Sequence, residues 1–274
     1  MNASTERQHY YHADASPVGG HITHPFEKII STEASSSLAQ AGGHVSGIHE
    51  SYRLDPIVSA QKAYSNITGA KNNTTGNWTS LTTSVVEYLN VLEVVTADRI
   101  VARLAVEHPA VGYTPRVSFV GVQFNNLRVN GHVVHPKLNL HLLESEHGKF
   151  PKKPHMKDDK FIKKVAEHGS RITEAKDAPE WAKTRYGWIG KAAEHEKRGH
   201  VLCSLVEEIK IEDGHGMKTY GHMIEVPDFG TIFFGELTVH HGLFQLTMMR
   251  MELGCPAIGN LSFASARSNG VTMP

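Results

Sequence analysis

The chain has 274 residues, of which 40% are hydrophobic and 20% are charged, a composition typical of a globular protein. Lys plus Arg and Asp plus Glu both total 28, so the balance of charge gives no reason to expect nucleic acid or an anionic membrane as a partner. No apolar run approaches the roughly 20 residues of a membrane-spanning helix. The polar N-terminal sequence is not a secretory leader. We expect a cytoplasmic protein, or an extracellular or cell-surface protein if a leader has been removed.

The N-terminal part of the chain is predicted to contain a tail, a loop and then strands. Residues 1–20 are expected to be a flexible tail, and residues 21–274 a single β-rich domain. Residues 31–47, rich in Ser, Ala and Gly, fit either a linker or the edge of a strand region. The Asn- and Thr-rich segment Gly69–Trp78 predicts a loop. The Val-, Leu- and Thr-rich segment Trp78–His108 predicts β structure.

The stretch Leu92–His108 carries both a strand-like and a helix-like apolar period. Its β-rich surroundings favour a strand. One face of that strand would carry Val94, Thr96, Asp98, Ile100, Ala102, Leu104, Val106 and His108. Charge pairing accounts for Arg99, Arg103 and Glu107 on the opposite face. Asp98 and His108 share the apolar face, and they are the two candidate catalytic residues.

A hairpin is predicted at Asn130-Gly131, which lies between two β-rich arms. Asn-Gly suits a two-residue type I′ turn because both central positions need positive φ. Val117–Val129 would form one or two strands, and His132–Leu142 the returning strand.

The segment Lys157–His200 changes character, because it is charged and poor in β-branched residues. We expect one helix near residues 159–168 and another near residues 179–197. Asp177 and Glu180 have the spacing of a capping box, with Pro179 in the first turn. Trp181 and Trp188 would pack these helices onto the rest of the protein or present them to a partner.

The β pattern returns after Gly199. His200–Asp213 predicts a strand, Asp228–Gly230 and Val239–Gly242 predict turns, and Leu261–Gly270 predicts a last strand. We therefore predict an all-β protein, a sandwich or barrel of about ten strands, with a helical segment inserted at about residues 157–198.

Several segments resemble the choice-of-anchor P proteins of bacteria. They are "VVTADRIVARL", "FNNLRVNGHVV", "VPDFGTIFFGEL", "FQLTMMRMELG" and "LSFASARSNG". The group shares a Thr-Ala-Asp strand, an Asn-Gly turn and a closing strand of small residues in this order, and the resemblance covers mainly residues 80–136 and 225–270. It implies a β-rich fold and a cell-surface or extracellular setting, but no activity. We expect the chain to depart from the group in having no leader and no anchor and in carrying the helical segment.

Nineteen histidines make a metal site worth testing. Three imidazoles can hold zinc or copper with one position left open, and the candidate ligands are His132, His135 and His240. Strand spacing argues for a structural alternative, because His132 and His135 are an odd number of residues apart and would point to opposite faces. Isolated surface histidines are then the simpler interpretation.

Motifs for covalent catalysis and phosphate binding are missing. The sequence has no G-x-S-x-G elbow, no P-loop and no G-x-G-x-x-G. Cys203 lies in an apolar strand, which favours a buried, inert thiol, and Cys255 follows a turn without an evident base. The one basic run, His147–Lys164, is interrupted by acids, so nucleic-acid binding is not expected.

Two functional hypotheses follow. The first is a non-catalytic structural or binding protein that self-associates through β edges into a homo-oligomer and that could take a small-molecule ligand. The second is an enzyme with a histidine and carboxylate site, with or without metal, at the mouth of a β-barrel under the helical segment. The sequence identifies no cofactor.

Overall fold

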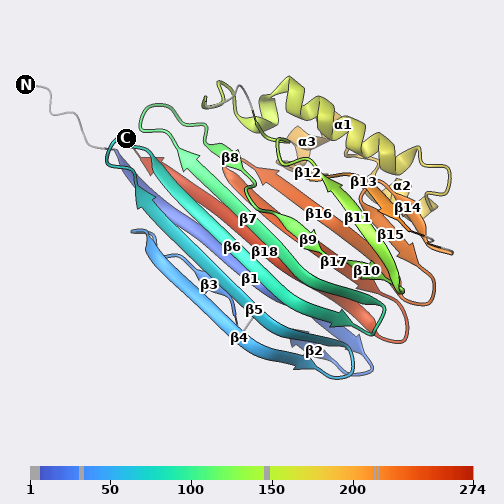
Figure 1. Ribbon diagram of the computed structural model, residues 1–274. Coiled ribbons are helices and arrows are strands. Elements are labelled where there is room, and N and C mark those ends of the chain that lie inside the picture. The colour runs from blue at the N-terminus through green and yellow to red at the C-terminus, as the bar shows by residue number, and fades with distance from the viewer. Residues whose placement is uncertain (1–6, 31–33, 145–148, 213, 215, 274) are drawn as a thin grey trace, which may run out of the picture.

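A computed structural model describes residues 7–30, 34–144, 149–212, 214 and 216–273. Within these residues, two antiparallel sheets of nine strands each pack face to face, and three α-helices lie beside one part of them (Figure 1). None of the described helices combines the length and the apolar character needed to cross a bilayer.

The first sheet has the strand order β14-β15-β16-β17-β18-β1-β2, with β12 also paired to β16 and β3 to β1. Its longest pairing joins the N-terminal strand to the C-terminal one, from Gln8 opposite Met273 to His24 opposite Ile258. Its strands are β1 (Gln8–His24), β2 (Lys28–Ile30), β3 (Ser36–Ser37), β12 (His200–Ser204), β14 (Lys218–Tyr220), β15 (Met223–Val226), β16 (Gly230–His240), β17 (Leu243–Leu253) and β18 (Ile258–Met273).

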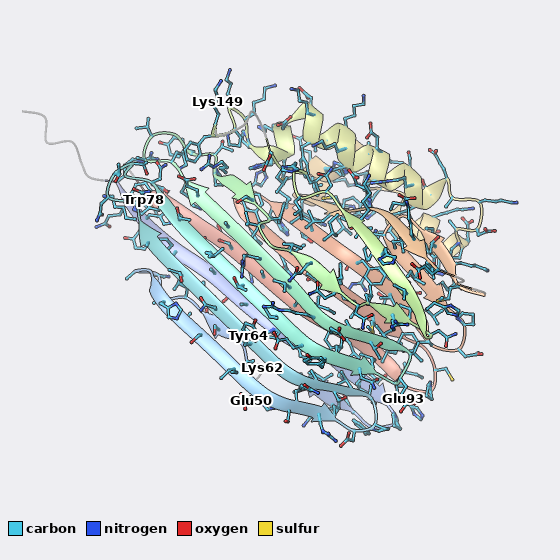
Figure 2. The ribbon with its side chains drawn as sticks, in the orientation of Figure 1. Glu50, Lys62, Tyr64, Trp78, Glu93 and Lys149 are labelled. Carbon is cyan, nitrogen blue, oxygen red and sulfur yellow. The ribbon has the colours of Figure 1, made fainter. Side chains whose placement is uncertain are left out.

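The second sheet has the order β13-β11-β10-β7-β6-β5-β4, with β8 and β9 paired to β7. Its strands are β4 (Gly43–Leu54), β5 (Val58–Lys71), β6 (Trp78–Val91), β7 (Val95–His108), β8 (Arg116–Ser118), β9 (Gln123–Asn125), β10 (Arg128–Val129), β11 (His132–Leu138) and β13 (Val206–Ile211). Polar side chains such as Glu50 on β4 and Lys62 and Tyr64 on β5 face outward (Figure 2).

The helical segment lies between β11 and β12. It comprises a 3-10 turn η1 (His155–Lys157), α1 (Asp159–Thr173), α2 (Glu180–Tyr186) and α3 (Ala192–Arg198). Asp158 caps α1 by accepting hydrogen bonds from the backbone N–H groups of Lys160 and Phe161. Phe161, Val165 and Ile172 recur at helical spacing and bury one face of α1 in the core that the sheets form.

The alternation of buried side chains changes phase partway along the long strands. On β7, Val95 and Ala97 are buried, and then Ile100, Ala102 and the following even-numbered residues. The change falls at Asp98, which stands between the paired positions Arg99–Glu87 and Ala97–Leu89 and therefore opposite Tyr88 of β6. Tyr88 has φ of 51°, a left-handed conformation that interrupts the extended backbone.

The same change of phase crosses both sheets. Ser51 on β4 and Asn126 between β9 and β10 also have positive φ at this level of the second sheet, and Ala264 on β18 does so in the first sheet. Core side chains point inward on both sides of this level. A long strand therefore changes from odd-numbered to even-numbered buried residues, or the reverse, where it passes the level.

The structure confirms the all-β class with an inserted helical segment and decides against a closed barrel, because both sheets end in separate edge strands. The predicted hairpin is confirmed: Asn130 and Gly131 have φ of 50° and 82°, and Val129 pairs with His132. The helical segment is confirmed, but its second predicted helix is two, α2 and α3, separated around Gly187 and Gly190.

Two further sequence predictions are wrong. Residues 8–20 belong to β1 and are not a flexible tail, because Tyr11, Ala13 and Ala15 alternate inward and β18 supplies their hydrogen bonds. Residues 1–6 lie outside the described part of the chain. The capping box does not form, because α2 begins after Pro179 and no side chain caps it.

Candidate functional site

The structure does not bring the two candidate catalytic residues together. Asp98 is exposed on β7, whereas His108 ends the same strand and is buried. Ten residues of extended strand separate them by about 33 Å. Asp98 faces solvent because the phase of the alternation changes at this residue. His108 instead lies beside His9 of β1, with ring centroids 4.5 Å apart.

The three candidate metal ligands do not meet at one site. His132 and His135 on β11 both approach Glu212, with His132 Nδ1 3.1 Å from its carbonyl oxygen and His135 Nε2 3.2 Å from its carboxylate. His240 lies on β16 of the other sheet and packs against His200 at 5.1 Å. Among the described residues, no three His, Cys, Asp or Glu side chains form a metal-binding group.

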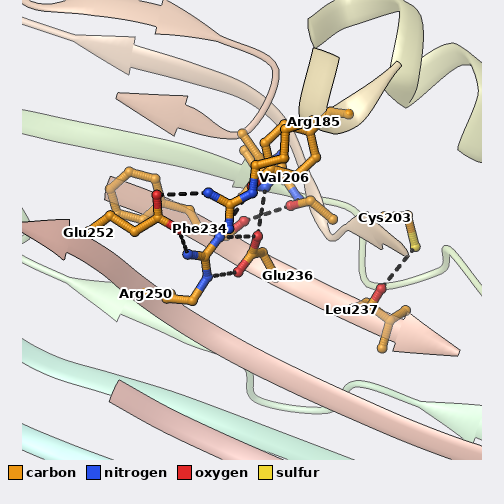
Figure 3. A network of polar contacts seen from close by, with 11 residues as sticks. Arg185, Cys203, Val206, Phe234, Glu236, Leu237, Arg250 and Glu252 are labelled. Carbon is orange, nitrogen blue, oxygen red and sulfur yellow. Dashed lines mark hydrogen bonds and ion pairs between the residues drawn. The ribbon is translucent and has the colours of Figure 1, made fainter. Parts of the chain in front are cut away.

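A buried network of charges that the sequence did not reveal connects the first sheet to the helical segment (Figure 3). Arg250 on β17 donates from Nε to Glu236 Oε2 at 2.6 Å and from a terminal nitrogen to Glu236 Oε1 at 2.9 Å. Its other terminal nitrogen donates to Glu252 Oε1 at 2.6 Å, and Arg185 of α2 also donates to Glu252. The Arg250 guanidinium lies 3.7 Å from the centroid of the Phe233 ring. One face of the guanidinium and all three of its nitrogens are therefore engaged.

Two histidines continue this network toward α1. His222 Nε2 lies 3.4 Å from Glu236 Oε1, and the His222 ring lies 4.9 Å from that of His168 on α1. Arg171 Nη2 approaches His168 Nδ1 at 3.4 Å. We assign His222 Nε2–H as the donor to Glu236, and Arg171 as the donor to His168 Nδ1. His168 Nε2–H and the His222 Nδ1 lone pair then have no hydrogen-bond partner among the described residues.

The protonation states follow from burial and from the partners. Burial raises the pKa of Glu236, but hydrogen bonds from Arg250 and His222 outweigh this effect and lower the pKa to about 2. Burial, together with the neighbouring His222 and Arg171, lowers the pKa of His168 well below its usual value. At neutral pH the network therefore holds an ionised carboxylate and a neutral His168.

A cavity of about 330 Å³ opens beside His168, between α1 and strand β12. Its floor contains the buried side chains of His168, Cys203 and Ser204. Its rim carries charges of both signs from α1 and from the strands. The lining residues are Asn139, Leu142, Lys164, Glu167, His168, Arg171, Cys203, Ser204 and Glu207.

Comparison of the sequence with protein-family models finds one match. A family model described as a domain of unknown function, DUF8256, matches residues 9–240. The chain belongs to the DUF8256 family. A search of the curated proteins finds no similar sequence. The match contains every residue that lines the cavity, together with His222 and Glu236, whereas Arg250 and Glu252 lie beyond it on β17.

The cavity of this DUF8256 protein contains a thiol and a hydroxyl, but both are hydrogen-bonded to backbone groups. Cys203 Sγ donates to the Leu237 carbonyl, and burial raises the pKa of the thiol. Ser204 Oγ donates to the Phe234 carbonyl at 2.7 Å and accepts from the Val206 N–H at 2.9 Å. Neither group is activated as a nucleophile, since nucleophilic catalysis requires a thiolate or an adjacent base.

The network was missed because its members come from four separate parts of the chain. His168 is on α1, His222 precedes β15, Glu236 is on β16 and Arg250 is on β17. The one signal in the sequence was the presence of single charges inside apolar strands, Glu236 in "IFFGELTV" and Arg250 in "LTMMRMEL". Ionised side chains are rarely buried without a partner, so such charges indicate a pair but do not identify it.

Proposed function

We propose that this DUF8256 protein is a non-catalytic binding protein and that the cavity beside α1 holds its ligand. The observation that carries the proposal is a cavity with a buried polar floor, on which His168 Nε2 has no hydrogen-bond partner. Buried polar groups are normally paired, so an unpaired one on a cavity wall favours a ligand or solvent molecule that completes it. The cavity volume of about 330 Å³ suits a small molecule.

The charges at the rim suggest the class of ligand. Lys164 and Arg171 are balanced by Glu167 and Glu207, so the opening favours neither sign. Lys164 is also directed to the carbonyls of His141 and Leu142, at 3.4 Å each, and Arg171 to the carbonyl of Glu207. A small polar molecule with little net charge fits this surface better than a phosphate or a polycation.

The Cys203 thiol and the Ser204 hydroxyl are hydrogen-bonded to the backbone, which favours binding over covalent catalysis. The alternative is an enzyme in which neutral His168 donates its Nε2–H to the bound molecule and stabilises negative charge that develops on it during reaction. The two functions differ in one outcome, because an enzyme would convert the molecule that it binds.

The test is a thermal-shift screen of small polar metabolites, followed by mass spectrometry of the incubated hits. Glu167 is exposed on α1 at the cavity rim, so Glu167→Trp should block the opening without disturbing the core. Lys163→Trp is the matched control, since Lys163 is exposed on the same helix and does not line the cavity. We expect hits that Glu167→Trp abolishes and Lys163→Trp retains. Hits that survive Glu167→Trp would contradict the site, and conversion of a hit would favour the enzyme.

Self-association and the resemblance to choice-of-anchor P proteins stay predictions, since the DUF8256 family description gives no activity and no oligomeric state. The strand edge suited to self-association is β4, a 12-residue strand that pairs with β5 on one side and with no other strand among the described residues. A strict monomer in light scattering at high concentration would contradict it.

A further inference from the structure

One end of the molecule, which we call the Trp78 end, brings together the start of β1, the end of β18 and the loop that joins β7 to β8 (Figure 1). Gln8 pairs with Met273 there, and the Trp78 ring, at the start of β6, stacks on that of His9 at 5.4 Å. These contacts bring the strand ends of both sheets to the same level. Figure 2 shows Trp78 at this end and Glu93, in the turn between β6 and β7, at the opposite end.

The loop between β7 and β8 exposes two apolar side chains to solvent. Val111 is 90% exposed and Tyr113 is 76% exposed, the highest values among the large hydrophobic side chains of the described residues. Tyr10 and Val271, which pair across β1 and β18, add two more at this end. Exposed apolar side chains that are grouped, unlike scattered ones, mark a surface that meets a partner or a membrane.

Hydrogen bonds from two neighbouring segments hold this loop in place. Arg7 Nη1 donates to the carbonyls of Ala110 and Gly112, at 3.0 Å each, and the Arg7 guanidinium lies 4.8 Å from the centroid of the Tyr113 ring. From the other side, the Ala110 N–H donates to Asn77 Oδ1 at 2.9 Å. The loop therefore presents its two apolar side chains in a defined conformation, which lowers the entropy cost of docking.

Cations surround these apolar side chains. Arg7 precedes β1, Lys71 ends β5 and Arg116 begins β8. Glu107 is the only acid in the four described segments that carry these groups, and it pairs with Arg116. The segments are residues 7–12, 68–80, 107–116 and 268–273. The Trp78 end is therefore positively charged at neutral pH.

A neighbouring segment adds two further cations. The Arg116 guanidinium lies 5.5 Å from the centroid of the Phe150 ring. Lys149 and Lys152 lie on either side of Phe150 in the chain and are exposed, and residues 149–154 contain no acid. The positive surface thus extends from the Trp78 end toward the start of the helical segment.

The turns at the opposite end of the molecule carry acids instead. The turns β1–β2, β4–β5, β6–β7 and β15–β16 each contain one acid and no Lys or Arg. The four acids are Glu27, Asp55, Glu93 and Asp228. The zero net charge of the chain therefore conceals a separation of charge along the strands. A negatively charged surface would orient such a molecule with the Trp78 end toward it.

We propose that the Trp78 end docks this protein on the surface of an anionic lipid bilayer, with Val111 and Tyr113 entering the interface. Apolar burial and attraction between basic side chains and anionic headgroups together drive this kind of binding. Tyrosine favours the level of the headgroups, because its ring is apolar and its hydroxyl is polar. A bilayer fits better than a nucleic acid, which offers no hydrocarbon layer for Val111. The proposal is independent of the cavity beside α1 and of the binding function proposed for it.

The test is cosedimentation of the full-length protein with lipid vesicles. One set contains phosphatidylcholine alone, and the other contains phosphatidylcholine mixed with phosphatidylglycerol. We expect binding to the anionic vesicles only, and weaker binding as the salt concentration rises, because salt screens the attraction. A titration with a short DNA duplex tests for a general affinity for polyanions, and we expect binding to DNA to be much weaker.

Paired variants at the two ends of the molecule locate the surface. The double variant Val111→Ser with Tyr113→Ser should weaken vesicle binding at least about tenfold, because it removes the inserted apolar groups. Ile29→Ser is the matched control, since Ile29 is 73% exposed on β2 at the opposite end. Lys71→Gln should weaken binding about fivefold, whereas Lys28→Gln, at an exposed position on β2, should not.

Melting curves verify that each variant is folded, and Val111→Ser alone replaces the double variant if the latter is not. Absence of binding to the anionic vesicles, or equal binding to neutral and anionic vesicles, would overturn the proposal. Wild-type affinity in the double variant, or an equal loss in Ile29→Ser, would also overturn it. Binding to DNA as tight as binding to the vesicles would identify a polyanion surface instead and would likewise overturn it.

Discussion

Arg250 compensates the negative charges of Glu236 and Glu252 beneath the helical segment, so we expect it to contribute strongly to the free energy of unfolding. Its guanidinium donates to two carboxylates and to the hydroxyl of Tyr186, and the side chain of Glu236 is only 10% exposed. Removing one partner of a buried ion pair leaves an uncompensated charge. We expect Arg250→Met to lower the free energy of unfolding by about 3–5 kcal/mol, measured by urea denaturation.

Two comparison variants separate pairing from packing at this residue. The double variant Arg250→Met with Glu236→Gln removes both charges, so it should recover part of the lost stability. Arg185→Met breaks the ion pair with Glu252, but the Arg185 side chain is 48% exposed, and the cost should be below about 1 kcal/mol. Equal losses for Arg250→Met and Arg185→Met would show that burial of Glu236 is not what makes Arg250 important.

At the scale of the strand, the sequence predicted where strands occur better than it predicted which of their side chains point inward. The composition of Trp78–His108 and the Asn130-Gly131 pair were sufficient to predict a strand region and a hairpin, because both depend on local preferences. The inward positions of Leu92–His108 were predicted correctly from Ile100 onward and were wrong before Asp98. A phase change depends on left-handed residues in the neighbouring strand, such as Tyr88, and a single strand's pattern does not contain that information. The buried network has the same limitation, since strand pairing brings Glu236 and Arg250 together.

Tyr88 offers a direct test of the phase change. A left-handed conformation costs a residue with a Cβ atom roughly 1–2 kcal/mol, whereas glycine adopts it freely. Tyr88 is 56% exposed, so little packing is lost on substitution. We expect Tyr88→Gly to keep or raise the free energy of unfolding, by up to about 1 kcal/mol. Leu81→Gly is the control on the same strand, at a position 38% exposed without positive φ, and should cost about 1 kcal/mol. Equal destabilisation by both variants would contradict a left-handed constraint at residue 88.

At the scale of the whole molecule, buried histidines couple stability to pH. Burial lowers the pKa of His108 to about 3, and burial, opposed by Asp158, lowers that of His155 to about 4. Below about pH 6.5 the unfolded chain binds protons at these histidines, whereas the folded chain does not. The free energy of unfolding is therefore highest above pH 6.5 and falls as the pH drops toward the folded-state pKa values. At pH 5 each of these two residues should cost about 2 kcal/mol relative to pH 7. Glu236, whose pKa is lowered to about 2, adds a second loss below about pH 4.5.

Urea denaturation at pH 8, 7, 6 and 5 measures this dependence. We expect nearly equal free energies of unfolding at pH 8 and 7 and a progressive decrease to pH 5. His155 packs against the rings of Phe161 and Phe244, so His155→Gln isolates one contributor. This variant should lose about 2 kcal/mol less than wild type between pH 7 and pH 5, even if it is less stable at every pH. His135→Gln, which removes an exposed histidine, should keep the wild-type slope. A flat profile from pH 8 to pH 5 in the wild type would show that the buried imidazoles find charge partners on protonation, and the same slope in His155→Gln would assign the dependence to other groups.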